Sequence, residues 1–330
     1  PVVISEFMAL NKNFMVDEDG DTSDWIELYN EQSTTVNLSG WSLSDDPGAP
    51  RKWVFPAVEI PPGEFLLVFA SGKDKRKPDG ELHTNFELLS EGEFLALYDP
   101  RGQVRSLFSP KFPEQVFDSS YGISMTREET DLIPEGAQVR YFVPRDSSLE
   151  DTWAAPDFDD SSWSTGQTGI GFDQRSNPLF ASDIRTDIGD AMRRVNASVY
   201  IRITFEMPAD KADSMLLLRM KFADGFVAYL NGVEVLRENA PSTVRYSSRA
   251  RRSRSAQEAL KFSVWRIQAQ DLIKQGTNVL AIQGMNNSRS DDDFYILPIL
   301  KAVKVTAVNR TDYRYFDSPS PRLPNEDGYK

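Results

Sequence analysis

An acidic loop near the start of the chain has the residue types of a cation site. Asp17, Asp19 and Asp21 occupy alternate positions, and Asp24 follows three residues later. Ca²⁺ takes about six to eight oxygen ligands in proteins, and a tight acidic loop can supply them. The loop departs from the EF-hand pattern, because its glycine comes fourth instead of sixth and Leu28 stands where that pattern has a glutamate. We favour a solvated acidic loop, with a structural Ca²⁺ at the four aspartates as the alternative.

The chain has few side chains suited to covalent or acid–base catalysis. Its 330 residues include no cysteine and one histidine, His83. Thiol nucleophiles and zinc sites built from cysteine are excluded, and any imidazole-dependent triad would have to use His83. The 50 acidic side chains do not point to a glycosidase, because among so many some pair will always have the spacing of that chemistry. We therefore predict that the chain is not an enzyme.

Four residues of the second half are candidates for contacts with a carbohydrate. Trp153 and Trp265 could stack on a sugar ring, and Arg202 and Asn231 could make polar contacts to it. Most rings of a β-sandwich are buried, so a core position is the favoured interpretation for any single ring. Trp265 is the first to test, because the alternation within residues 262–266 is compatible with an outward ring.

Five arginines lie between residues 245 and 254, interleaved with serine. Contact with a polyanion, such as an acidic polysaccharide or DNA, is one interpretation of this run. A solvated loop is the other. We favour the solvated loop, because Tyr246 is the one aromatic residue among the arginines.

Charge and hydropathy limit the partners. The net charge is −13, and residues 1–125 carry −11 of it. Phosphate binding needs clustered lysine and arginine, so we do not expect nucleic acid as a partner. No run approaches the ~18 apolar residues that a membrane span needs. The sequence begins at Pro1, and we expect it to be part of a longer protein whose leader is not included.

Short β-strands must position these residues. In residues 1–125, β-branched and aromatic runs are separated by turn sequences about every ten residues, and the pattern resumes at Val139. Asn231-Gly232 lies between two apolar runs, which predicts a hairpin with a type I′ turn. Many short strands with frequent turns are typical of sandwiches, so we predict an all-β fold.

The spacing of these runs predicts two tandem β-sandwiches. Residues 1–125 form the first, 126–137 a polar and acidic linker, and 138–306 the second. Residues 307–330 include closely spaced prolines, which predict an extended spacer to a module that the sequence lacks.

Four stretches of the first unit resemble the lamin tail domain, an immunoglobulin-like β-sandwich of nuclear lamins and of many bacterial extracellular proteins. They are residues 3–9, 24–30, 38–45 and 91–99. The resemblance implies an immunoglobulin-like fold and brings no catalytic residue with it.

The second unit resembles a galactose-binding-like jelly roll, the type appended to bacterial glycoside hydrolases. The matching stretches are residues 158–163, 169–172, 200–202, 224–232 and 276–281. This resemblance identifies a fold better than a ligand, because one framework serves both sugar binding and packing between domains.

Together these patterns predict a non-catalytic adhesion or carbohydrate-recognition region of a larger extracellular or cell-surface bacterial protein. Its expected partners are a carbohydrate or cell-surface polymer and neighbouring domains of the same chain. No cofactor is expected apart from the structural Ca²⁺. Two alternatives remain: a structural spacer that positions another module, and an accessory fragment of a glycoside hydrolase.

Overall fold

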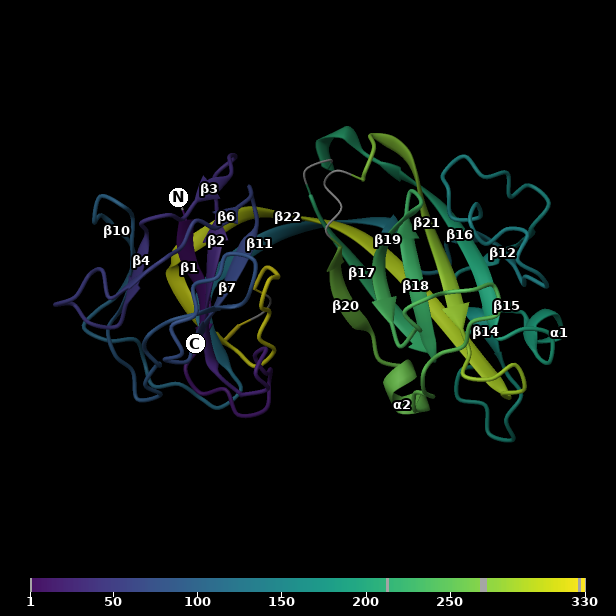
Figure 1. Ribbon diagram of the computed structural model, residues 1–330, viewed down its shortest axis with the longest axis horizontal. Helices are drawn as coiled ribbons and strands as arrows, with labels where there is room; N and C mark the ends of the chain where they lie inside the picture. Colours follow the sequence, from purple (N-terminus) through teal and green to yellow (C-terminus); the bar gives the residue numbers. More distant parts are fainter. Residues whose placement is uncertain (1, 212–213, 268–271, 326–327, 330) are drawn as a thin grey trace. The chain divides into compact units, whose positions relative to one another are not determined.

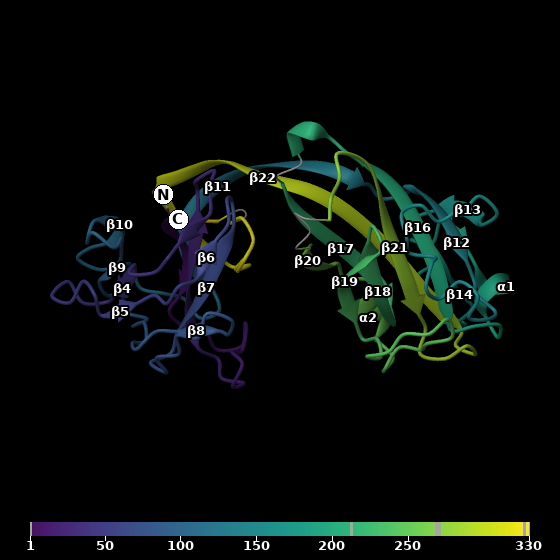
Figure 2. The ribbon, with the colours of Figure 1, turned by 45° about the horizontal axis from the view of Figure 1, so that its top comes forward.

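The computed structural model describes residues 2–211, 214–267, 272–325 and 328–329. The chain divides into two compact units. Unit 1 consists of Pro1–Glu128 and Val305–Lys330, and unit 2 of Glu129–Lys304. Strands dominate both units (Figures 1 and 2), so the prediction of an all-β chain is confirmed.

The first sheet of unit 1 has the strand order β11-β1-β2-β7-β8, and Figure 1 shows β1, β2 and β7 side by side. Its strands are β1 (Val2–Met8), β2 (Asp24–Asn30), β7 (Phe65–Ala70), β8 (Leu82–His83) and β11 (Ser120–Ile133). Every residue of β1 is buried, so both faces of this strand are covered and the carboxylate of Glu6 is enclosed.

A second sheet completes the sandwich of unit 1, with the order β10-β9-β4-β5. Its strands are β4 (Ser42–Ser44), β5 (Trp53–Val54), β9 (Leu95–Tyr98) and β10 (Val104–Phe108), and β3 (Val36–Asn37) pairs separately with β6 (Glu59–Ile60). Side chains of the two sheets share one core, with Ile4, Ile26 and Val68 from the first sheet and Leu43 and Leu97 from the second.

Unit 2 contains a six-stranded sheet with the order β13-β12-β16-β21-β18-β19. These strands are β12 (Gln138–Phe142), β13 (Ser164–Gln167), β16 (Ser198–Met207), β18 (Gly225–Leu230), β19 (Val233–Glu238) and β21 (Gly276–Met285). Figure 2 shows β12, β16 and β21 as neighbours.

The facing layer of unit 2 is built on β22, which pairs with β14 and β17. Its strands are β14 (Ile170–Asp173), β15 (Thr186–Asp187), β17 (Met215–Ala223), β20 (Ser263–Ile267) and β22 (Asp293–Phe316). Ile201 and Ile282 of the six-stranded sheet share a core with Leu218 and Ile296 of this layer. Unit 2 is therefore also a two-layered β structure.

The helical segments are single turns: α1 (Gly189–Met192), α2 (Ala256–Ala259) and the 3₁₀ turn η1 (Ala209–Lys211). Among the described residues, no helix has the length and hydrophobicity needed to cross a bilayer.

The hairpin predicted from Asn231-Gly232 is present. β18 and β19 pair in antiparallel fashion, with Leu230 opposite Val233. Asn231 has a φ of 49° and Gly232 a φ of 87°, as a type I′ turn requires at both central positions. The sequence was sufficient to predict this hairpin because the two central residues, Asn231 and Gly232, determine the turn type.

The division into units differs from the expected linker at 126–137 and spacer at 307–330. The chain passes between the units within β11 and again within β22, and residues 305–330 belong to unit 1. The tail folds back: the backbones of Tyr315 and Tyr329 pair, and the Asn325 amide donates to the carbonyls of Ser5 and Ile123. The spacing of the prolines suggested that residues 307–330 are an extended spacer. Hydrogen bonds from side-chain amides and hydroxyls help to hold the tail on unit 1, and these contacts need no backbone pairing to a neighbouring strand.

Candidate functional site

Three of the four predicted calcium ligands converge. The carboxylates of Asp17, Asp19 and Asp21 lie within 4.8 Å of one another, in a loop that Asp17 itself organises. Asp17 Oδ1 accepts the backbone N–H groups of Asp19 at 3.0 Å and of Asp21 at 3.1 Å. Gly20, with a φ of 87°, allows the chain to turn between them.

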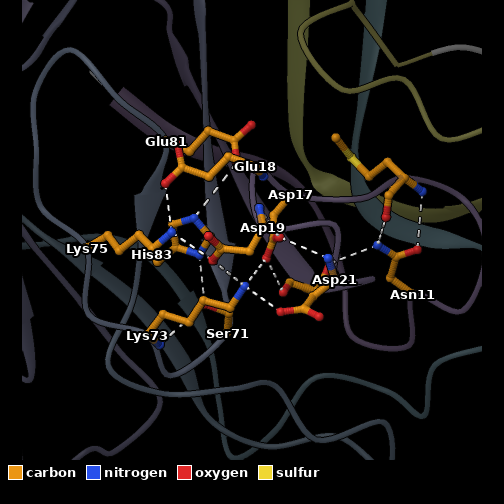
Figure 3. Close-up of polar contacts among 12 residues, drawn as sticks. Asn11, Asp17, Glu18, Asp19, Asp21, Ser71, Lys73, Lys75, Glu81 and His83 are labelled. Carbon is orange, nitrogen blue, oxygen red and sulfur yellow. Dashed lines mark hydrogen bonds and ion pairs between the residues drawn. The ribbon is translucent and has the colours of Figure 1, made fainter.

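A lysine of the chain occupies the centre of this acidic loop (Figure 3). Lys73 Nζ lies 2.6 Å from Asp17, 2.8 Å from Asp19 and 2.8 Å from Asp21. Lys75 Nζ adds contacts of 2.7 Å to Glu18 and to Asp19. An ammonium group held by three carboxylates supplies the positive charge that a bound cation would otherwise bring.

The ion pairs shift the pKa values of Asp17 and Lys73 so that both groups favour their charged forms. Burial alone would raise the pKa of Asp17, but hydrogen bonds from Lys73, Ser23 and two backbone N–H groups overcome it and hold that pKa well below its ordinary value. Burial likewise opposes the charge on Lys73, yet the three carboxylates raise its pKa. Asp17 and Lys73 are therefore both ionised at neutral pH.

Asp24 is not part of this group. Its carboxylate accepts the backbone N–H of Asn11 at 3.1 Å. Burial raises the pKa of Asp24 to about 6. Of the four predicted ligands, the structure thus brings together three, with Lys73 between them.

His83 lies beside the cluster with its ring fully buried (Figure 3). Its Nδ1 is 2.8 Å from the hydroxyl of Ser71, and its ring stacks on Phe69. The carboxylate of Glu81 is 3.9 Å from Nε2, beyond hydrogen-bond distance. Burial and the charge of Lys75 lower the pKa of His83. A serine, a histidine and a carboxylate are therefore adjacent, but the enclosed imidazole has no face from which to serve a substrate.

The ligand residues predicted in unit 2 have internal partners. Trp153 is buried and stacks on Tyr200 with ring centroids 4.1 Å apart. Arg202 donates to Asp160 at 2.7 Å and to the carbonyl of Trp153 at 2.6 Å. The side chain of Asn231 donates to the carbonyl of Leu272 and accepts the N–H of Val279. These three side chains fix local structure.

The alternation of residues 262–266 allowed the Trp265 ring to point outward, but in the structure the ring packs against the core. It is half-buried and packs on the core of unit 2, with ring centroids 6.0 Å from Phe222 and 5.7 Å from Phe226. Because β20 pairs with β17, the Trp265 ring covers the edge of the core instead of facing a ligand.

A cleft that the sequence did not reveal opens elsewhere in unit 2. It has a volume of about 550 Å³. Four arginines line it, together with polar and small residues: Arg145, Arg194, Arg249 and Arg289, then Pro144, Val195, Asn196, Ala197, Tyr246 and Ser247. Among the described residues, neither the predicted ligand residues nor any carboxylate belongs to this lining.

The topology of the six-stranded sheet brings the arginines together. Phe142 at the end of β12 pairs with Tyr200 near the start of β16, and Met285 at the end of β21 pairs with Ser198. Glu238 at the end of β19 pairs with Phe226 near the start of β18. The segments that carry the four arginines leave or enter these strands at one end of the sheet. Only Arg249 lies in the arginine run seen in the sequence.

Buried side chains hold these segments in place. The Asn196 amide donates to the carbonyl of Pro144 at 2.6 Å and of Tyr246 at 2.9 Å. Gln283 donates to the carbonyl of Arg245 at 2.7 Å, and the Ser198 hydroxyl to that of Ser248 at 2.8 Å. The Tyr246 ring also packs on the aromatic cluster of Trp153 and Tyr200. The arginine run is thus anchored at its base.

Comparison with known proteins bears on the first unit. Residues 1–111 match the family model of the Lamin Tail Domain. The predicted resemblance is confirmed for that stretch, and it includes the acidic loop, Lys73 and His83. The arginine-lined cleft lies outside the lamin tail domain, and the galactose-binding-like character of unit 2 stays a prediction. No curated protein matches the chain.

Several solved structures are similar to part of the chain. A β-glucuronidase of an uncultured Clostridium sp. is 14% identical over 55% of this chain and 29% of its own, with a TM-score of 0.34. A Bacteroides uniformis β-glucuronidase is 13% identical over 54% and 18%, also with a TM-score of 0.34. A Ruminococcus gnavus β-glucuronidase in complex with D-glucuronic acid is 11% identical over 54% and 29%, with a TM-score of 0.33. The chain spans less than a third of each, and scores this low support no inference about function.

Proposed function

We propose that the chain is a non-catalytic carbohydrate-binding region and that the arginine-lined cleft of unit 2 is its binding site. The observation that carries the proposal is the cleft itself, with its volume of about 550 Å³. Protein sites for small ligands have volumes of about 300–1,000 Å³ and a few well-placed polar groups. This cleft has that size, and its base is held by buried hydrogen bonds.

The lining supports binding of an oxygen-rich ligand. Guanidinium groups, the Tyr246 hydroxyl and the Ser247 hydroxyl offer many donors, and sugars are dense in oxygen acceptors. Hydrolysis of a glycosidic bond needs two carboxyl groups across the bond. No carboxylate lines the cleft among the described residues, which supports binding without cleavage.

We extend the proposal to the setting of the region, a larger extracellular or cell-surface bacterial protein. The match of residues 1–111 to the Lamin Tail Domain supports this, because the resembled family includes bacterial extracellular proteins. Within such a protein, the region would attach its neighbours to a glycan.

A glycan array probed with the whole chain tests the proposal. Ser247→Trp places a large ring in the cleft without removing an arginine, so we expect it to abolish glycan retention while the melting temperature is unchanged. Ser242→Trp, at an exposed position outside the lining, is the matched control and should retain binding. A folded wild-type chain that retains no glycan would refute carbohydrate recognition and favour a structural spacer.

A further inference from the structure

We infer that the cleft of unit 2 selects an anionic oligosaccharide segment, one that carries carboxylate or sulfate groups. This inference rests on the proposed function and narrows it. The four guanidinium groups of Arg145, Arg194, Arg249 and Arg289 would hold the anionic groups of one short segment.

The four arginines lack partners in the part of the chain that the structure describes. Over the described residues, none of their side chains takes part in an ion pair, a hydrogen bond or a ring contact. Neighbouring arginines differ: Arg193 pairs with Asp292, and Arg245 lies 3.6 Å from Glu150. Four like charges that gather around one cleft repel one another, and an external anion removes that repulsion.

The arrangement is built into the fold. Arg194 and Arg289 lie on segments joined by a hydrogen bond from the Arg194 N–H to the Arg289 carbonyl. The backbone N–H of Ala250, next to Arg249, donates to the carbonyl of Asn286 at 3.0 Å, and the buried amide of Asn196 holds Pro144, next to Arg145. These hydrogen bonds hold the backbone segments together, so the four arginines start from one end of the sheet around one cleft.

Guanidinium groups suit carboxylate and sulfate in particular. Their planar donors form two parallel hydrogen bonds to such groups, which adds geometric selection to charge. Ser247 and Tyr246 also line the cleft, and their hydroxyl groups would serve the neutral part of a sugar ring.

The observations favour a saccharide over a nucleic acid. Single-stranded nucleic acids bind along extended basic grooves with several stacked aromatic rings, and Tyr246 is the one aromatic residue of the lining among the described residues. Unit 2 carries 24 acidic and 22 basic residues, a net charge of −2, so the unit as a whole has no excess of positive charge. A short anionic segment that meets the four arginines suits this charge better than a long polyanion does.

Calorimetric titration of the whole chain with four probes tests the inference. The probes are a galacturonate trimer for carboxylate, a heparin-derived tetrasaccharide for sulfate, maltotriose as the neutral sugar, and a twelve-nucleotide single-stranded DNA. We expect one of the two anionic saccharides to bind best, which identifies the anionic group. Arg145→Gln and Arg289→Gln should each raise its Kd about tenfold or more.

Arg251→Gln provides the matched control, since Arg251 is an exposed arginine of the same run that does not line the cleft. It should leave the Kd unchanged within about twofold. Equal binding of maltotriose, unaffected by the arginine substitutions, would overturn the anionic inference and leave the carbohydrate site standing. Binding of no saccharide would refute both proposals. Tightest binding of the DNA, lost in the arginine variants, would overturn the choice of a saccharide.

Discussion

Lys73 takes the position in the acidic loop that a metal ion would take. Three carboxylates surround its ammonium at 2.6 to 2.8 Å, and one of them, Asp17, is fully buried as a side chain. The spacing of the aspartates was visible in the sequence. Their partner was not, because Lys73 lies more than fifty residues farther along the chain, after β7. The calcium site stays a prediction, and it requires the ammonium to be displaced.

Replacing Lys73 tests which cation the loop uses. Lys73→Met should lower the free energy of unfolding by about 1 kcal/mol, because Asp17 loses its nearest positive charge. Millimolar Ca²⁺ should then raise the melting temperature of the variant, since Asp17 and Asp21 have lost their ammonium partner and carboxylates attract a divalent ion.

Thermal melts in EDTA and in CaCl₂ measure both effects. Lys77→Met is the control, because the ion-pair partner of Lys77 among the described residues is the exposed Asp79. If the wild-type protein melts at a lower temperature in EDTA than in CaCl₂, the native loop binds Ca²⁺ despite Lys73, and the interpretation of Lys73 as its sole cation is wrong.

Asn231 was predicted as a ligand contact, and the structure gives it a role in the turn. Asn231→Ala should destabilise the protein by about 2 kcal/mol, because alanine tolerates a positive φ poorly and cannot replace the bonds to Leu272 and Val279. Asn231→Gly keeps the turn and should cost less. Urea unfolding distinguishes the two variants. An unchanged stability combined with weaker glycan binding would restore the ligand role.

Among the elements, β1 and β2 place two carboxylates opposite each other. Glu6 pairs with Glu27 in the antiparallel register, and both side chains are fully buried. Such cross-strand neighbours have Cβ atoms about 5 Å apart. Residues 320–325 cover the pair: Ser320 donates to Glu6, and the backbone N–H of Arg322 donates to Glu27.

Burial determines the protonation of this pair. It raises the pKa of Glu6 to about 7, although Ser120 and Ser320 hydrogen-bond to the carboxylate. Burial, together with the charge of Glu6, raises the pKa of Glu27 well above its ordinary value. The nearby guanidinium of Arg322 offsets only part of this. The pair therefore retains protons at a pH where free glutamates have lost them.

We predict that the stability of unit 1 falls as the pH rises from 5 to 8. Folded Glu6 binds its proton up to about pH 7, whereas unfolded Glu6 releases it near pH 4.5, so folding is favoured by protonation and this contribution is lost on deprotonation. The loss amounts to about 3 kcal/mol for Glu6. Asp24 adds a loss in the same direction, and His83 opposes it.

Urea unfolding of the wild type and of Glu6→Gln at several pH values isolates the contribution of Glu6. The difference in unfolding free energy between the two proteins should change across the range from pH 5 to 8. The hydrogen-exchange protection factors of the Ser320 and Arg322 amides should fall with pH only in the wild type, once the intrinsic base catalysis of exchange is divided out. Glu59→Gln, at an exposed strand position, should behave as the wild type does. Parallel curves for wild type and Glu6→Gln would contradict the prediction.

Local sequence patterns predicted where the strands and turns lie better than they predicted which distant residues contact them. Alternation and turn residues indicated β1, β2 and the hairpin at Asn231, because those signals lie within a few residues. The polar second half of β11 carries no such signal. Its stability includes the ion pairs of Lys301 with Glu129 and Asp131, which only the folded chain brings within 3.2 Å.

For the molecule as a whole, the candidate site arises from topology. Arg145, Arg194, Arg249 and Arg289 are spread over about 145 residues, and no motif joins them. Four segments at one end of a sheet bring them to one cleft. Sequence reasoning could identify the arginine run at 245–254, yet it could not show which member faces a cleft, because Arg251 of the same run does not.

The net charge of −13 sets a further expectation for binding. Affinity for oligogalacturonates should rise with length only until the cleft is filled, because additional sugar residues extend past the four arginines and gain no further guanidinium contact. Added NaCl should weaken binding by screening the guanidinium groups. Calorimetry with a length series at two salt concentrations measures both. An affinity that grows steadily with polymer length would instead indicate an extended basic surface.

The double passage of the chain through β11 and β22 makes unit 2 an insertion within unit 1. A ribosome would finish unit 2 before it made residues 305–330, so the residues that cover Glu6 and Glu27 emerge only after unit 2. The N-terminal sandwich must wait, with two acidic side chains uncovered, until its inserted neighbour has been synthesised. Completion of the first unit is thereby linked to the synthesis of residues 320–325.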